Sequence, residues 1–313
     1  MNLPRVIADT PLAANTNELL AGKVEILPWE TPVGDGDESI AAIYTYGHRL
    51  VDGELMDRFP NIKVISNYGV GVDHVDLAAA GERGIPVGNT PEILNGATAD
   101  MAMTLLLAAG RRLIEGDHYA RSADFTYYDP GYMLGREVHS STIGIIGLGR
   151  IGLEIARRAR AFDMSVLYYN RNERDDLPAE LEARYTPFDQ LLAQSDYVVL
   201  SCPLTEETEG LIGEQELERM KSTAILVNVA RGGVVDTAAL TTALQQGSIY
   251  HAALDVTDPE PLPRDHPMLG LSNVTIAPHL GSATEQTRQQ MAENSVENLL
   301  LGLAGEELKT RVV

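Results

Sequence analysis

Short apolar runs alternate with amphipathic stretches along the second half of the chain. Six runs rich in Val, Ile and Tyr have the length of buried strands: 142–147, 165–169, 197–201, 224–229, 251–255 and 273–277. Between them, apolar residues recur at helical spacing over 150–161, 187–194 and 236–246. Apolar strands that alternate with helices are typical of a parallel sheet covered on both faces. The pattern therefore predicts a doubly wound α/β domain.

A second series of the same kind comes earlier in the chain. Its predicted strands are 4–8, 24–27, 42–44, 64–67 and 86–88, which indicates a smaller α/β domain. Between the two series, residues 97–112 are apolar on nearly all sides. This favours a helix buried against another domain or another subunit, and its apolar centre is too short to span a bilayer.

Composition narrows the class of protein. A chain of 313 residues with 44% hydrophobic residues can build two cores, and its single cysteine, Cys202, allows no intrachain disulfide. Asp9 interrupts the first apolar run before a secretory signal could form. A formal net charge of -21 opposes binding to nucleic acid or to an anionic membrane. We therefore expect a soluble, cytoplasmic protein that binds neither.

A glycine-rich turn joins the first strand of the larger domain to the helix that follows it. The turn consists of Gly147, Leu148, Gly149, Arg150, Ile151 and Gly152. In such a turn the first glycine allows the bend, the second lets backbone approach a pyrophosphate, and the third lets the helix pack on the strand. A turn without a ligand is the alternative, but the position between strand and helix favours a dinucleotide site.

The residues after the second strand of this domain bear on the choice of cofactor. NAD-specific folds place an acid there, whereas this chain has Asn170, followed by Arg171 and, nearby, Arg174. A guanidinium could pair with the 2′-phosphate of NADP(H). NADP(H) is therefore expected, and NAD(H) remains possible if the arginines are only solvated loop charges.

Three polar residues follow the ends of successive predicted strands: Arg231, Glu260 and His279. Reduction of a 2-keto acid requires a cation for the carboxylate and carbonyl and an acid that delivers a proton. Arg and His meet these needs, and a carboxylate beside the imidazole would favour its protonated form. Taken singly, His279 could be a core histidine, Glu260 a solvated loop acid, and Arg231 a capping residue.

Taken together, these segments resemble the D-isomer-specific 2-hydroxyacid dehydrogenase family over nearly the whole chain. Gly69–Asp73, Asn89–Pro91 and Cys202–Thr205 belong to the same match, and 253–263 with 265–269 are most similar to the glyoxylate/hydroxypyruvate reductases. The resemblance implies that Arg231 orients the substrate, Glu260 pairs with the histidine, and His279 transfers the proton.

The family resemblance also implies the binding residues. Backbone amides of Tyr68, Gly69, Val70 and Gly71 would hold the substrate carboxylate together with Arg231, an ordinary strand-ending turn being the alternative. Besides the glycine-rich turn, the implied cofactor contacts are Thr98, Asn170, Arg171, Pro203, Thr208, Ala230, Arg231, Asp255, His279 and Gly281.

The implied architecture has a flavodoxin-like substrate domain and a Rossmann cofactor domain. The first would comprise residues 1–96 and 282–313, and the second 97–281, with a cleft between them. Because the helix over 97–112 matches the family's dimer-forming region, the resemblance implies a homodimer. The sequence leaves open whether His48 or Tyr46, after a strand of the smaller domain, contacts substrate.

The expected reaction is hydride transfer from NAD(P)H to a small 2-keto acid such as glyoxylate or hydroxypyruvate, which gives the D-2-hydroxy acid. A hydroxyphenylpyruvate or D-lactate-type reductase is the alternative within the family, and an NAD(H)-sensing, corepressor-like binding protein is the alternative outside catalysis. We expect no metal, because the histidines other than His279 lack partners at metal-ligand spacing.

Overall fold

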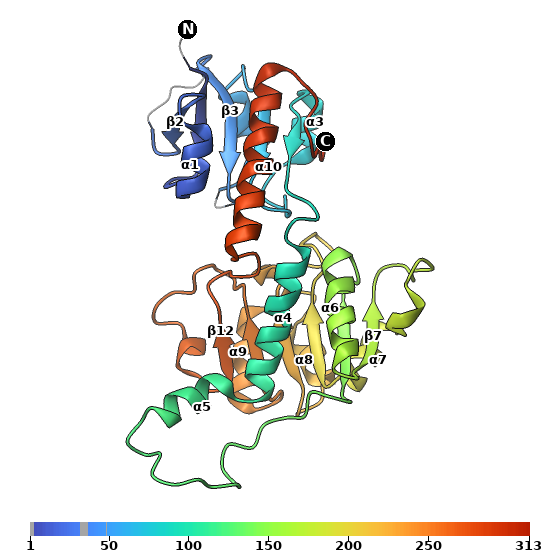
Figure 1. Ribbon diagram of the computed structural model, residues 1–313. Coiled ribbons are helices and arrows are strands. Elements are labelled where there is room, and N and C mark those ends of the chain that lie inside the picture. The colour runs from blue at the N-terminus through green and yellow to red at the C-terminus, as the bar shows by residue number, and fades with distance from the viewer. Residues whose placement is uncertain (1–2, 32–36, 48) are drawn as a thin grey trace. The chain divides into compact units, whose positions relative to one another are not determined.

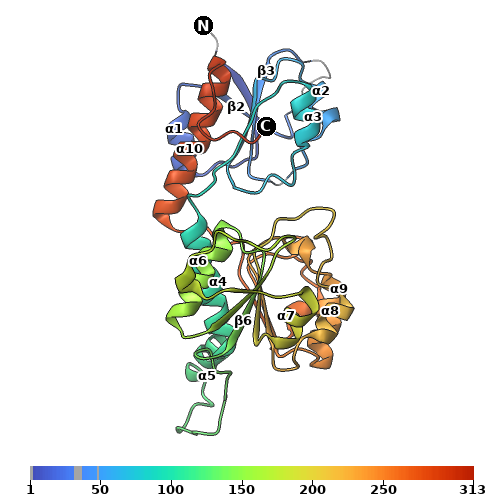
Figure 2. The ribbon, with the colours of Figure 1, turned by 90° about the vertical axis from the view of Figure 1, so that its right-hand side faces the viewer.

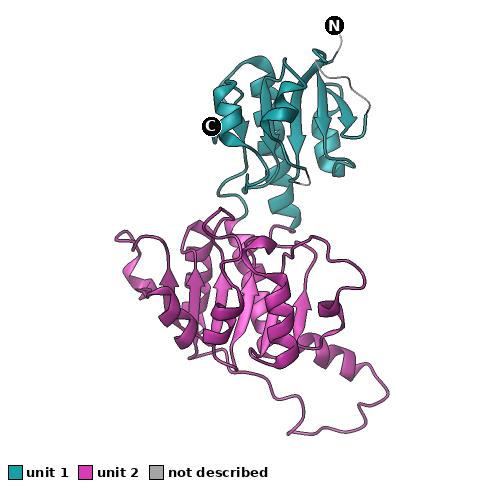
Figure 3. Cartoon of the chain, turned by 180° about the vertical axis from the view of Figure 1, so that it is seen from behind, with its two compact units in different colours: residues 1–94, 284–313 teal, residues 95–283 magenta. Residues whose placement is uncertain are grey.

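The computed structural model describes residues 3–31, 37–47 and 49–313. The chain divides into two compact units, of which unit 1 comprises residues 1–94 and 284–313 and unit 2 comprises residues 95–283 (Figure 3). The boundaries expected from the sequence, 96/97 and 281/282, lie two residues away from these. Each unit is an α/β domain built on one parallel sheet, so the predicted fold class is confirmed.

Unit 1 contains a five-stranded parallel sheet with the order β2-β1-β3-β4-β5. The strands are β1 (Arg5–Ala8), β2 (Glu25–Pro28), β3 (Ile40–Thr45), β4 (Val64–Asn67) and β5 (Val87–Gly88). All five lie within two residues of the apolar runs that predicted them. The order places the carboxyl ends of β1, β3 and β4 side by side at one edge of this sheet.

Helices cover both faces of the sheet in unit 1 (Figure 2). They are α1 (Ala14–Leu20), α2 (Gly53–Asp57), α3 (Leu77–Glu82) and α10 (Glu285–Ala304). The long α10 begins after Thr284, whose side chain accepts a hydrogen bond from Thr287 N, and ends at Gly305 with a φ of 77°. It packs on β3, β4 and α1, which returns the end of the chain to the first domain.

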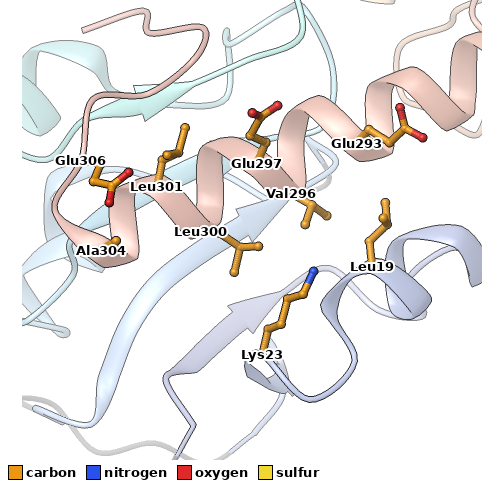
Figure 4. A pocket seen from close by; sticks show the side chains of 9 residues that line it. All are labelled: Leu19, Lys23, Glu293, Val296, Glu297, Leu300, Leu301, Ala304 and Glu306. Carbon is orange, nitrogen blue, oxygen red and sulfur yellow. The ribbon is translucent and has the colours of Figure 1, made fainter.

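A groove lies between α1 and α10 of unit 1 (Figure 4). Its volume is about 330 Å3, and Leu19, Val296 and Leu300 give it an apolar floor. At the rim, Lys23 is the one positively charged residue among the nine that line the groove. No residue that the sequence assigns to substrate or cofactor lines it.

Unit 2 contains a seven-stranded parallel sheet with the order β12-β11-β10-β9-β6-β7-β8. The strands are β6 (Thr142–Ile146), β7 (Ser165–Tyr169), β8 (Arg184–Tyr185), β9 (Tyr197–Leu200), β10 (Ile225–Asn228), β11 (His251–Leu254) and β12 (Val274–Ile276). Six of them match predicted strands. The seventh, β8, consists of two residues at the edge of the sheet, too short for a periodic signal.

The helices of unit 2 form two layers, with α4 and α6 on one face of the sheet and α7, α8 and α9 on the other (Figure 2). The α-helices are α4 (Asn95–Gly110), α5 (Leu113–Ala120), α6 (Arg150–Ala161), α7 (Phe188–Gln194), α8 (Glu214–Arg219) and α9 (Thr237–Gln246). Three short 3-10 helices are η1 (Ala179–Leu181), η2 (Gly232–Val234) and η3 (Pro267–Gly270). Within the described ranges, no helix is long and apolar enough to cross a membrane.

The apolar helix between the two predicted domains is α4, and it is buried within its own unit. Ala102, Leu105, Leu106 and Ala109 belong to the core cluster that also contains the inner residues of β6 and β9. Helix α4 lies beside α6, a contact that Figure 1 displays. The apolar surface that suggested burial against another domain or subunit is thus largely accounted for by packing inside unit 2.

The order of the strands in unit 2 fixes where a ligand can bind. Strand β6 comes first in this domain and lies between β9 and β7, so the chain leaves it in one direction for β7 and later returns to its other side at β9. Loops that follow β6 and β9 diverge at this point, which is where open parallel sheets bind ligands. The glycine-rich turn follows β6.

Candidate active site

The glycine-rich turn requires glycine at two positions because other backbone comes very close. Gly147 has a φ of 95°, and a Cβ there would lie 2.5 Å from the backbone N of Cys202. A Cβ on Gly152 would lie 2.5 Å from the carbonyl oxygen of Gly147. Only glycine lets the strand bend sharply here and lets α6 pack directly against it.

Gly149 differs from its neighbours because open space surrounds it. Its φ is -87°, and a Cβ there would meet no atom within 4 Å. Helix α6 begins at the next residue, and the first N–H groups of a helix have no partner within the helix and carry the positive end of its dipole. The turn therefore supplies the space and the positive potential that a pyrophosphate needs, so these residues fit a dinucleotide.

Asn170 lies at the end of β7 and is joined to this turn. The N–H of Leu148 donates to Asn170 Oδ1 at 2.6 Å. Since the oxygen of the side-chain amide is used here, its NH2 group is the remaining donor. A donor at this place suits the oxygens of a 2′-phosphate or a ribose hydroxyl.

The two arginines after β7 have different environments. Arg174 Nη1 donates to Leu148 O at 2.9 Å, and Nη2 and Nε donate to the Asp176 carboxylate at 2.5 and 2.7 Å. Its guanidinium is thus already paired within the protein, which leaves it fewer donors for a 2′-phosphate. The Arg171 side chain is 80% exposed, with Nη1 3.8 Å from Glu207 Oε2.

The loop after β9 carries two residues assigned to the cofactor. Thr208 Oγ1 donates to the carbonyl of Pro203 at 2.6 Å and accepts from the N–H of Thr205 at 2.8 Å. These bonds close the loop on itself. Thr208 therefore shapes the backbone of this loop through its hydroxyl.

Glu260 and His279 meet at the carboxyl edge of the sheet in unit 2. His279 Nδ1 lies 2.7 Å from Glu260 Oε1, and Glu260 Oε2 accepts from the N–H of Thr257 at 3.3 Å. Burial would raise the pKa of Glu260, but the hydrogen bond and charge of His279, the N–H of Thr257 and the charge of Arg231 outweigh it. The pKa of this carboxyl is lowered, so at neutral pH it is a carboxylate that accepts from the imidazole.

Arg231 follows β10 at the same edge. Its Nη1 donates to Ala230 O at 2.9 Å. Buried Asn228, the last residue of β10, donates from Nδ2 to Arg231 O at 2.9 Å and accepts from Ala230 N at 3.0 Å. A Cβ on Gly232 would lie 2.0 Å from Thr257 O, so glycine lets this turn approach the segment that carries Glu260. This approach brings Arg231 close enough to Glu260 for its charge to lower the pKa of the carboxyl.

Asp255 fixes the segment that contains His279. The His279 N–H donates to Asp255 O at 2.9 Å, while the Asp255 carboxylate accepts from Leu280 N at 2.6 Å and from Gly281 N at 2.7 Å. Burial raises the pKa of this carboxyl despite the two N–H donors. A Cβ on Gly281 would lie 3.0 Å from Asp255 Oδ2 and 3.4 Å from the methyl group of Thr98. Three residues assigned to the cofactor are thus adjacent.

The four residues assigned to the substrate carboxylate follow β4 in unit 1. Their carbonyl groups accept bonds from nearby side chains: Asn67 Nδ2 donates to Gly69 O at 2.9 Å and Gly71 O at 2.7 Å, Asn89 Nδ2 to Val70 O at 2.9 Å, and Thr90 Oγ1 to Tyr68 O at 2.8 Å. Across the residues that the structure describes, no acceptor bonds the N–H groups of Gly69, Val70 and Gly71. The carbonyls are therefore fixed while the amides remain available, which is the arrangement of an anion-binding nest.

An aromatic side chain packs against this turn. The ring of Tyr46 meets that of Tyr68 edge to face, with centroids 4.9 Å apart. Tyr46 is thus beside the turn assigned to substrate. His48, the other candidate in this loop, lies outside the described residues.

A family model now accounts for most of unit 2. Residues 103–281 match the D-isomer specific 2-hydroxyacid dehydrogenase, NAD binding domain. The chain belongs to this family. The resemblance seen in the sequence motifs is therefore confirmed.

Relatives within the D-2-hydroxyacid dehydrogenase family match almost the whole chain. A glyoxylate reductase of Thermococcus gammatolerans is 44% identical over 99% of this chain and 96% of its own. An NADPH-dependent glyoxylate/hydroxypyruvate reductase of Sinorhizobium meliloti, solved in complex with NADP and malonate, is 33% identical with a TM-score of 0.89, covering 99% and 97% of the two chains. A D-lactate dehydrogenase of Aquifex aeolicus, complexed with NAD and lactic acid, is 28% identical with a TM-score of 0.88 over 99% of each chain.

In this dehydrogenase fold the motifs missed residues that position the site rather than contact a ligand. Asn228 shapes the turn before Arg231, and Gly232 lets that turn approach Thr257. A polar residue that ends a strand of buried apolar residues was the one available signal for Asn228. The described residues include no group of three or more His, Cys, Asp or Glu side chains arranged to hold a metal ion.

Proposed function

We propose that this chain reduces glyoxylate or hydroxypyruvate to the D-2-hydroxy acid, with NADPH as the preferred reductant. The observation that carries the proposal is the 2.7 Å contact between His279 Nδ1 and Glu260 Oε1, with the charge of Arg231 close to the same carboxylate. These side chains occupy the same edge of the sheet as the glycine-rich turn. An acid, a cation and a dinucleotide site at one edge are the groups that reduction of a 2-keto acid needs.

When bound, the dinucleotide would supply a hydride for the carbonyl carbon of the substrate. Because Nδ1 of His279 is held by Glu260, Nε2 is the atom that delivers a proton to the carbonyl oxygen. The Glu260 carboxylate keeps the ring in this orientation and balances the positive charge of the imidazolium. Arg231 stabilises the negative charge that develops on the oxygen and orients the substrate.

The turn of Tyr68, Gly69, Val70 and Gly71 is proposed to bind the substrate carboxylate. Three N–H groups for which the described residues hold no acceptor support this role, since an anion would complete their hydrogen bonds. The fixed carbonyls limit the energetic cost of ordering the turn when the ligand arrives. Because Tyr46 packs against Tyr68, it is proposed to support this turn.

NADP(H) is the proposed cofactor and NAD(H) the alternative. The donor group of Asn170 and the exposed guanidinium of Arg171 support a 2′-phosphate, and neither residue would repel it. Thr98, Pro203, Thr208, Ala230, Asp255 and Gly281 are proposed to contact the remainder of the dinucleotide. Arg231 and His279 would border the nicotinamide.

We also propose that the protein is a cytoplasmic homodimer. The segment between α5 and β6 carries large apolar side chains in solvent, with Tyr127 71%, Tyr128 80% and Leu134 69% exposed, which supports contact with a second copy. Cys202 is 9% exposed, and burial raises the pKa of its thiol to about 11, so it carries little thiolate at neutral pH, which is compatible with a reducing compartment. Light scattering that gives a monomer would refute the dimer.

The proposed reaction is tested by an assay matrix. NADPH and NADH are each combined with glyoxylate, hydroxypyruvate, pyruvate and hydroxyphenylpyruvate, and loss of absorbance of the reduced nicotinamide is followed. We expect the highest kcat/KM with NADPH and one of the first two acids, and His279→Ala should lower kcat by about 10²- to 10⁴-fold.

Other outcomes of this matrix assign the alternatives. Fastest turnover of hydroxyphenylpyruvate or pyruvate would replace the proposed substrate by that of a hydroxyphenylpyruvate or D-lactate-type reductase. Binding of NADH without turnover of any acid would favour the corepressor-like sensor.

A further inference from the structure

Two loops of unit 2 bring opposite charges together beside the glycine-rich turn. Arg171 follows β7 and Glu207 follows β9, the strands that lie on either side of β6. Arg171 Nη1 is 3.8 Å from Glu207 Oε2, and the two side chains are 80% and 67% exposed. The pair thus lies in solvent, where an incoming ligand can reach both charges.

The position of Glu207 is set by its own loop. Thr205 Oγ1 donates to Glu207 Oε2 at 2.8 Å, which is the oxygen that faces Arg171. This hydrogen bond, the residue's own backbone N–H and the charge of Arg171 lower the pKa of the Glu207 carboxyl. At neutral pH the side chain is therefore a carboxylate, and it is held toward the guanidinium.

The second arginine after β7, Arg174, is already paired within the protein. Arg174 is bonded to Asp176 and to Leu148 O, so Arg171 is the arginine of this loop that can turn toward a ligand. A 2′-phosphate that pairs with Arg171 must therefore displace Glu207 or accept it as a neighbour. The 2′-hydroxyl of NAD(H) carries no charge and meets no such repulsion.

We propose that Glu207 is a cofactor-specificity residue that weakens the binding of NADP(H) and thereby keeps NAD(H) usable. The inference rests on the proposed function, since it concerns the same dinucleotide site. The Glu207 carboxylate competes for Arg171 and repels the 2′-phosphate. Because the charges are exposed and screened, the effect is a severalfold change in affinity rather than a thousandfold one.

The experiment measures dissociation constants of NADPH and NADH by the fluorescence of the reduced nicotinamide. Glu207→Gln removes the carboxylate and preserves the shape of the side chain. Glu206→Gln is the matched control, because it removes the same charge from the neighbouring exposed residue. Arg171→Leu, alone and combined with Glu207→Gln, tests whether the effect passes through the arginine.

We expect Glu207→Gln to tighten NADPH by about three- to tenfold at low salt, with NADH unchanged within about twofold. In the Arg171→Leu background the gain in NADPH affinity should shrink. Salt at about 0.5 M should also reduce this gain, because the charges are exposed. Thr205→Val, which releases Glu207 without changing charge, should shift NADPH binding in the same direction by less.

Two results have distinct meanings. If the unmodified protein binds both nucleotides and Glu207→Gln changes the ratio of their dissociation constants no more than Glu206→Gln does, the inference is wrong and the proposed function stands. If the unmodified protein binds neither nucleotide, the proposed function is wrong and this inference falls with it.

Discussion

The imidazole of His279 and the carboxylate of Glu260 meet through Nδ1 and Oε1 at 2.7 Å, although 19 residues separate them in the chain. Two close approaches produce this contact. The Asp255 carboxylate binds the N–H groups of Leu280 and Gly281, which holds the histidine segment, and Thr257 N donates to Glu260, which holds the acid. The orientation of the ring is therefore built by backbone donors from two adjacent loops.

Glu260→Gln should lower kcat by about 10- to 10²-fold and change the pH profile. The pKa of Glu260 is lowered, so in the unmodified protein its carboxylate persists at a pH below the ordinary carboxyl range. Activity should be lost only at the lower pH at which this carboxylate takes up a proton. Gln cannot make this transition, so the variant should lack that acid limb. Glu260→Asp keeps the charge and should retain more of the rate. Identical acid limbs in the parent and the Gln variant would show that the carboxylate does not govern it.

Gly147 and Gly149 of the turn should respond differently to alanine. Gly147→Ala places a Cβ 2.5 Å from Cys202 N at a φ of 95°, and we expect a loss of about 2–4 kcal/mol in the free energy of unfolding. Gly149→Ala has no atom within 4 Å of the added Cβ, so stability should change by less than about 1 kcal/mol. Its methyl group would occupy space proposed for the pyrophosphate, so NADPH should bind more weakly. Urea unfolding and nucleotide titration measure the two effects, and normal NADPH binding by Gly149→Ala would count against the cofactor turn.

The nest of unit 1 depends on Asn67, whose Nδ2 donates to Gly69 O and Gly71 O. Asn67→Asp removes both donors and sets a negative charge against two carbonyls, which should tilt the turn and raise KM for the keto acid by about tenfold or more. Binding of NADPH should be unchanged within about twofold, because its proposed residues belong to unit 2. Exposed Asn61, changed to Asp, is the control for added charge on the same unit. An unaltered KM in folded Asn67→Asp would remove the turn from substrate binding.

The parts of the fold that the sequence predicted are those with a strong local signal. Helix α6, predicted over 150–161, spans Arg150–Ala161, because Gly152, Ile155, Ala156 and Ala159 repeat along one buried face. Strand β8 has two residues and depends on pairing with β7, so its sequence alone carries no period. Helix α4 looked like an interface helix because its apolar residues do not reveal which surface buries them.

The site was predictable where chemistry resides in one residue and unpredictable where it depends on contacts between loops. Arg231, Glu260 and His279 follow strand ends that the hydrophobic pattern already located. Arg174 was expected beside Arg171 as a second cation for phosphate, but its bonds to Asp176 and Leu148 come from the folded turn. Likewise Asp255 holds the His279 segment through two N–H groups 25 and 26 residues away, a contact with no counterpart in the local sequence.

Buried His251 should make the protein less stable in acid. Its Nε2 lies 3.0 Å from Thr275 Oγ1. Burial lowers the pKa of His251 from 6.5 to about 4; the charge of Glu115 raises this pKa and that of Arg112 lowers it, but both effects are smaller than that of burial. The unfolded chain then binds a proton between these values that the folded protein does not. The contribution of His251 to the free energy of unfolding is therefore fully present above about pH 6.5 and is lost as pH falls toward 4.

The difference between the two pKa values, 6.5 and about 4, corresponds to at most roughly 3 kcal/mol in the free energy of unfolding. His251→Gln removes this contribution, while its amide can still bond Thr275. Between about pH 7.5 and pH 4.5, the free energy of unfolding of the variant should therefore fall by up to roughly 2–3 kcal/mol less than that of its parent. Exposed His118, changed to Gln, should leave the pH dependence as it is. Urea unfolding at both pH values measures the difference, and parallel pH curves for His251→Gln and its parent would mean that this histidine takes up its proton equally well in the folded and unfolded chain.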